Sequence, residues 1–335
     1  MRYIFALILI MCALGVNALE WEDQQLFEGQ SGTLTLRVVS STDTSVFAPI
    51  IESFLNSYPE LNVEYLVAGS SDIYNSYRRA PNQFDVVISS AMDLQLKLVN
   101  DGYARTLEEL IHPDWAQWRQ SVFGFTLEPA AIVINKAAFE SLPVPGSRQE
   151  MIEVLRANPE VFRGRIGTYD VRQSGLGYLL ATQDARSSET YWRLMEIMGG
   201  LDARLYCCSG DMIKDLAEGK IAISYNVLGS YADARDDLAN KIQVILPSDF
   251  PTTMMRTALV SVGSTQTEAA TAFLKFLITS QWATPGREDN PLPALGTNTA
   301  TTPRSVIALD PGLMIFLDKM KRQIFVNAWE NAIIQ

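Results

Sequence analysis

Histidine is nearly absent from this sequence, and its absence removes much chemistry. His112 is the only one, and it stands ahead of a proline in the segment LIHPDW, which is typical of a loop or a helix boundary. Serine and cysteine nucleophiles usually need a histidine base, so an ordinary catalytic triad has this single candidate. The patterns HExxH, CxxC and GxxxxGKS/T, which mark zinc, thiol and phosphate sites, do not occur. The sequence therefore nominates no enzyme, no cofactor and no metal site.

Cysteine is also scarce, with three residues in a chain of 335. Cys12 follows Met11, which is bulkier than the residue expected before a lipidated cysteine, so we expect no lipid anchor. Cys207 and Cys208 are adjacent and could form a vicinal disulfide, pair between molecules or stay as buried thiols. We expect buried thiols. Two neighbouring cysteines alone cannot build a structural zinc site.

Long apolar runs are missing except at the start of the chain. Arg2 precedes an apolar stretch over residues 3–16, and Val16, Asn17 and Ala18 supply small residues at the positions that a signal peptidase reads. We therefore predict a cleaved signal peptide at residues 1–18 and export to the periplasm. No later run approaches the roughly 20 apolar residues that a membrane helix needs, so the mature protein is expected to be soluble.

Positive charge is in the minority, since 27 lysines and arginines face 38 acidic residues and the formal net charge is −11. Such a surface argues against a nucleic-acid partner, because phosphate backbones demand clustered basic side chains. It does not exclude a small anion in a local pocket. The length is comfortable for two lobes, and we expect a monomer.

An alternation of strands and helices begins at residue 33. The runs TLTLRVVSS, NVEYLVAGS and FDVVISS predict three strands, and the first is followed by a helix with Val46, Ile50, Phe54 and Tyr58 on one face. This βαβαβα order predicts a parallel sheet with helices on both faces. A second series, with the runs GRIGTYD, IAISYNV and IQVILP, repeats the pattern.

Hydroxyl side chains gather where the first three predicted strands end. They are Ser41 and Thr42 with Asp43, then Ser70 and Ser71, then Ser89 and Ser90. Because the carboxyl ends of parallel strands share one edge, where ligands bind in open α/β sheets, we expect these residues to face one cleft. The alternative is three independent helix caps, but a cap needs only one hydroxyl.

The second series carries a matching junction in the segment YDVRQSGLGYLLATQ. Ser174 and Gly175 open a predicted helix with Arg172 just before them, and helix N-termini favour anions. Arg256 stands where it could also reach an oxyanion, and Tyr225 and Asn226 could orient the rest of a ligand. Each has a plainer alternative: a helix cap for Ser174, surface charge for Arg172, a structural pair with a carboxylate such as Asp170 or Glu128 for Arg256, and core packing for Tyr225.

The order and spacing of several segments resemble a known family. They are FDVVISSAMDLQLKLVNDGYA, TYDVRQSGLGYLLATQDA, YWRLMEIMGG, ISYNVLGSYADAR and VILPSDFPTTMMRTALV. Together they resemble the extracellular solute-binding proteins of ABC transporters, in the branch that includes ferric-iron, thiamine and hexose-phosphate binders, and most closely the phosphoglycerate transport regulatory protein group.

The resemblance implies an α/β fold of the type 2 periplasmic-binding kind, in which two lobes, each a mainly parallel sheet flanked by helices, close on a solute. We expect one lobe from residues 33–130 and 262–335 and the other from residues 131–261. Two crossing strands would join the lobes, near Thr126 to Ile132 and near Arg256 to Val262.

The resemblance also bears on the ligand and the partners. Ferric-binding relatives use two adjacent tyrosines, whereas Tyr225 and Tyr231 are separated here and no adjacent pair exists. A small phosphorylated or carboxylated metabolite is therefore the expected solute. The loaded protein would dock on an ABC permease or, alternatively, on the periplasmic domain of a sensor kinase. A hydrolase with this fold is a more distant alternative.

Overall fold

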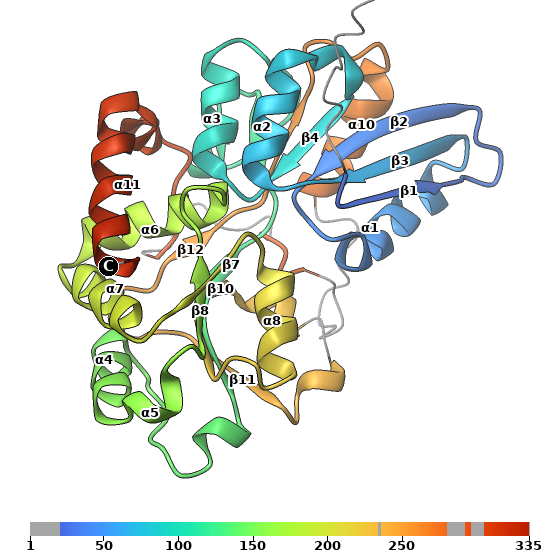
Figure 1. Cartoon of the computed structure of the whole chain (residues 1–335). Helices are drawn as coiled ribbons and strands as arrows, with labels where there is room; N and C mark the ends of the chain where they lie inside the picture. The colour runs from blue at the N-terminus through green and yellow to red at the C-terminus, as the bar shows by residue number, and fades with distance from the viewer. Residues whose placement is uncertain (1–20, 234–235, 280–291, 296–304, 335) are drawn as a thin grey trace, which may run out of the picture.

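Two mixed sheets flanked by helices make up the molecule, as the computed structural model shows for residues 21–233, 236–279, 292–295 and 305–334 (Figure 1). The predicted signal peptide lies outside these described residues. The two-sheet α/β architecture confirms the fold class expected from the strand and helix pattern.

The first sheet has seven strands in the order β1-β3-β2-β4-β13-β6-β5. At its centre, β2 pairs in parallel with both β3 and β4, as the βαβαβα pattern predicts. Antiparallel strands extend it on both sides, because β1 pairs with β3 and β13 pairs with β4 and β6. The bounds are β1 Asp23–Phe27, β2 Leu34–Ser40, β3 Leu61–Val67, β4 Val86–Ser89, β5 Gln117–Trp118, β6 Val122–Gly124 and β13 Thr257–Val260.

Helices cover both faces of this sheet, with α2 and α3 on one side and α1 and α10 on the other (Figure 1). In α1, the residues at spacing four that the sequence singled out include Val46, Ile50 and Phe54, which are all buried. The bounds are α1 Thr44–Ser57, α2 Ser70–Arg79, α3 Met92–Asn100 and α10 Thr267–Ile278, with short 3-10 turns η1 Pro81–Gln83 and η2 Asp114–Ala116.

The second sheet follows the order β11-β7-β10-β8-β9, and β12 also pairs with β7. Here β8 pairs in parallel with β9 and β10, whereas β7 is antiparallel to its neighbours. The bounds are β7 Glu128–Asn135, β8 Ile166–Tyr169, β9 Arg204–Tyr206, β10 Ile223–Leu228, β11 Ile242–Ile245 and β12 Thr253–Met254.

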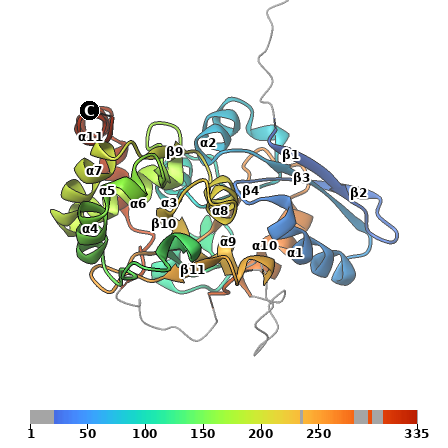
Figure 2. The same cartoon turned by 60° about the horizontal axis from the view of Figure 1, so that its bottom comes forward.

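The remaining helices belong to this second half, except for η5, which packs against α3 of the first, and α8 lies between the two sheets in both views (Figure 2). Their bounds are η3 Ala137–Phe139, α4 Arg148–Ala157, α5 Pro159–Phe162, α6 Gly175–Ser187, α7 Thr190–Gly200, α8 Ser209–Ala217, α9 Gly229–Asp233, η4 Asp236–Leu238, η5 Pro311–Leu317 and α11 Lys319–Ile333.

The chain crosses between the sheets close to the expected places. It leaves the first sheet after β6 and enters the second at β7, and it returns between β12 and β13. Because β13 pairs with β4, the return occurs at residues 255–256, and residues 257–261 belong with the first lobe. This corrects the expected boundary at 261 by a few residues.

The C-terminal helix differs from the expectation more strongly. We expected residues 262–335 to complete the first lobe, but α11 packs against α7 of the second, where Phe325 and Trp329 join the buried cluster that contains Leu194 and Met198. The 3-10 segment η5 just before it packs against α3 of the first lobe. No helix among the described residues has both the length and the apolar character needed to cross a membrane.

Candidate functional site

Helix N-termini from both lobes meet at a small cavity, which we call the first chamber. Its volume is about 40 Å³. The residues at or just before the starts of α1, α2, α3, α6 and α8 all contribute to its walls. The lining residues are Glu22, Ser41, Asp43, Ala68, Gly69, Ser70, Ser90, Tyr169, Ser174, Leu176, Cys207, Cys208, Ser209, Leu228, Tyr231 and Arg256.

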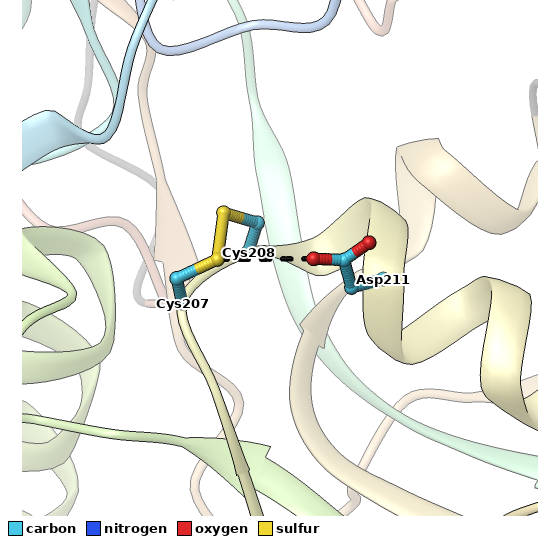
Figure 3. A group of neighbouring side chains, drawn as sticks. All are labelled: Cys207, Cys208 and Asp211. Carbon is cyan, nitrogen blue, oxygen red and sulfur yellow. Dashed lines mark hydrogen bonds between the residues drawn. A yellow bond between two sulfur atoms is a disulfide. The ribbon is translucent and has the colours of Figure 1, made fainter. Parts of the chain in front are cut away.

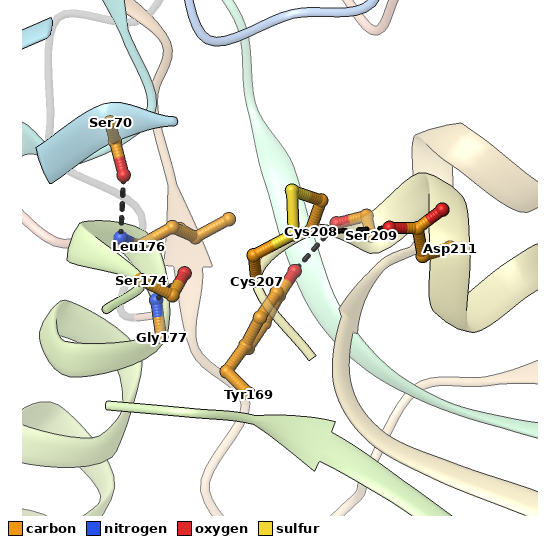
Figure 4. The surroundings of a disulfide bond; sticks show 9 residues. All are labelled: Ser70, Tyr169, Ser174, Leu176, Gly177, Cys207, Cys208, Ser209 and Asp211. Carbon is orange, nitrogen blue, oxygen red and sulfur yellow. Dashed lines mark hydrogen bonds between the residues drawn. A yellow bond between two sulfur atoms is a disulfide. The ribbon is translucent and has the colours of Figure 1, made fainter. Parts of the chain in front are cut away.

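The two lobes touch at the edge of this chamber. The Ser70 hydroxyl of α2 accepts a hydrogen bond from the Leu176 amide of α6 at 3.2 Å, which is seen at the left of Figure 4. Ser71 and Gly175, the neighbours of these residues, line a second cavity of about 240 Å³. We call it the second chamber; its walls are Ser71, Tyr74, Asn75, Asp93, Leu94, Lys97, Arg172, Gly175, Tyr178, Leu317 and Arg322.

The structure divides the residues expected at one cleft into three groups. The first chamber takes Ser41, Asp43, Ser70, Ser90, Ser174 and Arg256. The second takes Ser71, Arg172 and Gly175. Neither chamber is lined by Thr42, Ser89, Tyr225 or Asn226.

The serine hydroxyls that follow the strands form hydrogen bonds with each other and with backbone amides. Ser41 Oγ lies 3.2 Å from Ser90 Oγ and accepts the Ser90 amide at 3.0 Å, which joins two strand ends. Ser89 Oγ instead accepts the Ala91 amide at 3.1 Å beside the start of α3. Ser174 is a helix cap, because its Oγ accepts the Gly177 amide at 3.1 Å. A serine hydroxyl can still donate while it accepts, so the Ser174 cap and its place in the chamber wall are compatible.

Arg256 is completely buried, and its charge is already compensated. Its guanidinium donates to Glu128 Oε2 at 2.9 Å and to the hydroxyl of Thr42, and it lies 5.6 Å from the centre of the Tyr231 ring. Burial lowers the pKa of Arg256, but Glu128, Tyr231 and Tyr65 together outweigh burial and the pKa is raised. The carboxylate pair weighed as the alternative for Arg256 is thus present.

Arg172 is also held by carboxylates. Its Nε and Nη2 donate to the two oxygens of Asp170 at 2.8 and 2.6 Å, and its Nη1 reaches Glu330 at 3.4 Å. The hydrogen bonds to Asp170 raise the pKa of Arg172. The Arg172 side chain lines the second chamber. It does not line the first chamber, where Ser174 lies.

Tyr225 and Asn226 lie in a buried ionic network of the second lobe. The Tyr225 hydroxyl donates to Asp184 Oδ2 at 2.5 Å and accepts from Arg148 Nε at 2.7 Å. Asn226 Nδ2 donates to the same Asp184 oxygen at 2.8 Å, and Arg148 Nη2 donates to Oδ1 at 3.0 Å. The sequence reading missed Arg148 and Asp184, and the structure moves Tyr225 and Asn226 from the expected cleft to the core.

Comparisons with known proteins agree with this geometry. Residues 52–292 match the family of bacterial extracellular solute-binding proteins. The chain belongs to this family. Its members bind solutes rather than transform them, so the expectation of a binding protein is confirmed. No curated protein sequence matches the chain.

Solved structures resemble this solute-binding protein over nearly its whole length. The substrate binding protein of an ABC transporter from Agrobacterium tumefaciens is 29% identical, with a TM-score of 0.86 and coverage of 93% of this chain and 98% of that chain. AfuA from Actinobacillus pleuropneumoniae, solved with fructose-6-phosphate, is 12% identical, with a TM-score of 0.72 and coverage of 90% and 99%. Iron-bound HitA from Pseudomonas aeruginosa is 13% identical, with a TM-score of 0.63 and coverage of 89% and 99%. The last two likenesses show the fold alone.

A disulfide between Cys207 and Cys208 forms part of the chamber wall of this solute-binding protein. It stands at the start of α8, across from the Ser70–Leu176 contact (Figure 4). Cys207 is exposed, so the expectation of buried thiols was wrong. Next to the pair, Ser209 Oγ lies 2.5 Å from the hydroxyl of Tyr169, and both line the chamber.

Among the described residues, three or more side chains of the types that can bind a metal come together only at this disulfide. Cys207, Cys208 and Asp211 bring their ligand atoms within 4.8 Å of one another (Figure 3). The thiolate is the metal-binding form of cysteine, and both sulfurs are joined in the disulfide. In this state the group does not suit a metal.

Two carboxylates stand at the first chamber. Burial, followed by nearby acidic groups, raises the pKa of Glu22. Burial also raises the pKa of Asp43 against the opposing effect of Arg256. Asp43 precedes α1 without a side-chain capping bond, which leaves its carboxylate at the chamber wall.

Proposed function

We propose that this protein captures a small metabolite bearing an oxyanion in the first chamber and delivers it, in the periplasm, to the permease of an ABC transporter. The supporting observation is the convergence of five helix starts on one cavity. Unpaired amides in the first turn of a helix carry partial positive charge and bind phosphate and carboxylate groups. The family membership and the transporter protein from Agrobacterium tumefaciens support the role in uptake.

The charges around the chamber assign the recognition to amides and hydroxyls. Arg256 is neutralised by Glu128, and Arg172 by Asp170. The anion would therefore be held by backbone amides and by the hydroxyls of residues such as Ser70, Ser174 and Ser209, which lie on the chamber wall.

The size of the chamber implies that the lobes move. A volume of about 40 Å³ is close to the roughly 30 Å³ that one water molecule occupies in the liquid. A metabolite therefore needs the contact between Ser70 and Leu176 to open before it enters. We propose that the described state is the closed one and that solute binding selects an arrangement slightly wider than it.

The first compounds to test follow from the likenesses. The quoted sequence segments resemble the phosphoglycerate transport regulatory group, and AfuA holds fructose-6-phosphate. We therefore expect 3-phosphoglycerate or a hexose phosphate to raise the melting temperature of the mature protein, whereas glycerate without phosphate, free fructose and ferric iron do not. A ligand at a hundredfold excess over Kd stabilises the folded state by about 2.7 kcal/mol. A melting temperature that responds only to free sugars or to iron would disprove the oxyanion proposal.

Ser174→Ala tests where the solute binds. The change removes a helix cap, which costs about 1 kcal/mol of stability, and it removes a hydroxyl from the chamber, which we expect to weaken binding by about 1.5 to 3 kcal/mol. Ser147→Ala is the matched control, because Ser147 Oγ caps α4 by accepting the Glu150 amide at the same 3.1 Å and lines neither chamber. Calorimetric titration of both variants should show lost affinity for Ser174→Ala alone. Equal affinities would leave Ser174 as a cap and nothing more.

A further inference from the structure

The second chamber is a cavity that the proposed function does not use. Its volume of about 240 Å³ is about eight times the roughly 30 Å³ share of one water molecule. Both lobes build it, because α2 and α3 contribute from one side and α6, η5 and α11 from the other. Leu94, Leu317 and the rings of Tyr74 and Tyr178 give it partly apolar walls.

A buried carboxyl group in its wall has too few partners. Asp93 lies in the first turn of α3 and is only 2% exposed. Among the described residues, the hydrogen bonds to it come from its own helical turn, with the Leu94 amide 2.9 Å from Oδ1. Burial raises the pKa of Asp93 to about 7. A carboxyl group has several lone pairs, so Asp93 can still accept a hydrogen bond from a donor outside its own helical turn.

One cation in the same wall, Arg322, forms no salt bridge with any residue that the structure describes. Lys97 pairs with Asp101, and Arg172 pairs with Asp170. Arg322 lies 4.5 Å from the centre of the Tyr178 ring and donates only to the Arg172 carbonyl, at 3.5 Å, within the described part of the chain. It is close enough to Asp93 to stabilise the charged form of that carboxyl group. A guanidinium with free donors is suited to a carboxylate.

We propose that the second chamber binds a small α-amino acid with an apolar side chain. Its ammonium group would donate to Asp93, its carboxylate would accept from Arg322, and its side chain would pack on Leu94 and Leu317. A simple anion would bring no donor to the Asp93 carboxyl group, and a simple amine would bring no carboxylate to Arg322. Only a ligand with both charges satisfies both groups.

Such a ligand would also act on the solute site. Because both lobes line the second chamber, an occupant adds contacts to the closed arrangement that the open one lacks. Any effect of the amino acid on the affinity for the solute would then be matched by an equal effect of the solute on the affinity for the amino acid. The proposal does not depend on the identity of the solute in the first chamber.

The probes are L-leucine and two analogues that each lack one charge. The analogues are 4-methylpentanoate, without the amine, and 3-methylbutylamine, without the carboxylate. In calorimetric titration of the mature protein we expect L-leucine to bind, and each analogue to bind at least tenfold more weakly. Binding of either analogue as tight as that of L-leucine would overturn the assignment of paired charges, and absence of leucine, alanine and phenylalanine binding at millimolar concentrations would overturn the site.

Variants connect the binding to the two residues. Asp93→Asn and Arg322→Gln should each weaken leucine binding at least tenfold, whereas Arg163→Gln, at an exposed ion pair remote from both chambers, should leave it unchanged. Thermal melting checks that each variant is folded. Ser209→Ala, which touches only the first chamber, should lower affinity for the phosphorylated solute and not for leucine. Leucine binding that survives both Asp93→Asn and Arg322→Gln would place the amino acid elsewhere.

Discussion

Tyr225 holds a hydroxyl between two buried charges, and this position determines what its removal does. The hydroxyl donates to Asp184 and accepts from Arg148, whose side chains are 2% and 1% exposed. Tyr225→Phe leaves both groups short of a partner, which costs about 1 to 3 kcal/mol. We expect a lower midpoint in urea with unchanged solute affinity. If affinity falls while the midpoint stays, Tyr225 touches the solute after all.

The pKa of His112 gives a second prediction for a single residue. It is easy to measure because the chain has only one histidine. Burial lowers the pKa of His112 from 6.5 to about 4, against the effect of the Gly124 carbonyl, which lies 2.7 Å from Nε2. The unfolded chain therefore binds a proton between pH 6.5 and 4 that the folded chain does not. This contribution to stability is complete above pH 6.5 and is lost as pH falls towards 4.

The measurement is an NMR titration of the imidazole signals, which come from a single histidine. We expect no change until the pH approaches 4. In a parallel series, His112→Gln should show a shallower loss of unfolding free energy over the same pH range. A midpoint near 6.5 would mean that the ring is solvated.

Single residues also show what the sequence could and could not predict about the site. The pairs of hydroxyls marked the strand ends, and Glu128 was one of the two carboxylates considered as a partner for Arg256; the other, Asp170, pairs with Arg172. Glu330, by contrast, is 158 positions from Arg172, and Asp184 is 36 from Arg148. Charges on separate elements give no local signal of their pairing, so a free arginine and a neutralised one look the same in the sequence.

At the scale of elements, the spacing of apolar residues in the sequence was sufficient to predict most of the strands and helices that form the core. The runs read as β2, β3 and β4 form the parallel centre of the first sheet, and β8 and β10 are parallel neighbours in the second. α11 buries one apolar face, with Phe325, Trp329 and Ile333. Such a face shows that a helix is buried but not against which lobe, which is why α11 was assigned to the wrong one.

The contact of α11 with α7 leads to a prediction at Gly199. A Cβ atom there would lie 2.4 Å from the Ala332 carbonyl oxygen and 2.8 Å from the Ile333 Cα. Gly199→Ala should therefore lower stability by about 1 to 3 kcal/mol, the usual cost of overpacking. Gly200 is exposed one residue later in the same helix, and Gly200→Ala should be neutral or stabilising because alanine favours helix. Urea denaturation compares the stability of the two variants. Equal midpoints would show that α7 and α11 can move apart to fit the added methyl group without a loss of stability.

At the scale of the whole molecule, Gly175 governs how closely the lobes approach. A Cβ atom at this position would lie 2.8 Å from Ser70 Oγ and 2.9 Å from Leu94 Cδ1, both in the opposite lobe. The sequence placed Gly175 at a helix start that favours anions, whereas the structure shows that the other lobe approaches closely at this position. Gly175→Val should hold the lobes apart and reduce solute affinity more than tenfold, about 1.4 kcal/mol.

Small-angle scattering can detect this change. We expect Gly175→Val to have a larger radius of gyration than the wild type, both with and without solute, while circular dichroism shows that its helices and strands persist. A variant as compact as the liganded wild type would contradict the role of Gly175 in closure.

The consecutive elements η5 and α11 have a consequence for the speed of unloading. One packs on α3 of the first lobe and the other on α7 of the second, and the bend between them is fixed where Asp318 accepts the Met320 and Lys321 amides at 3.1 Å. The lobes are thus held together by a third stretch of chain, in addition to the two crossings. This stretch lies outside the first chamber, where we propose that the solute binds. Each opening event must separate η5 from α3, so the residence time of the cargo depends on a contact outside the first chamber. Affinity and release rate can therefore change independently in this protein.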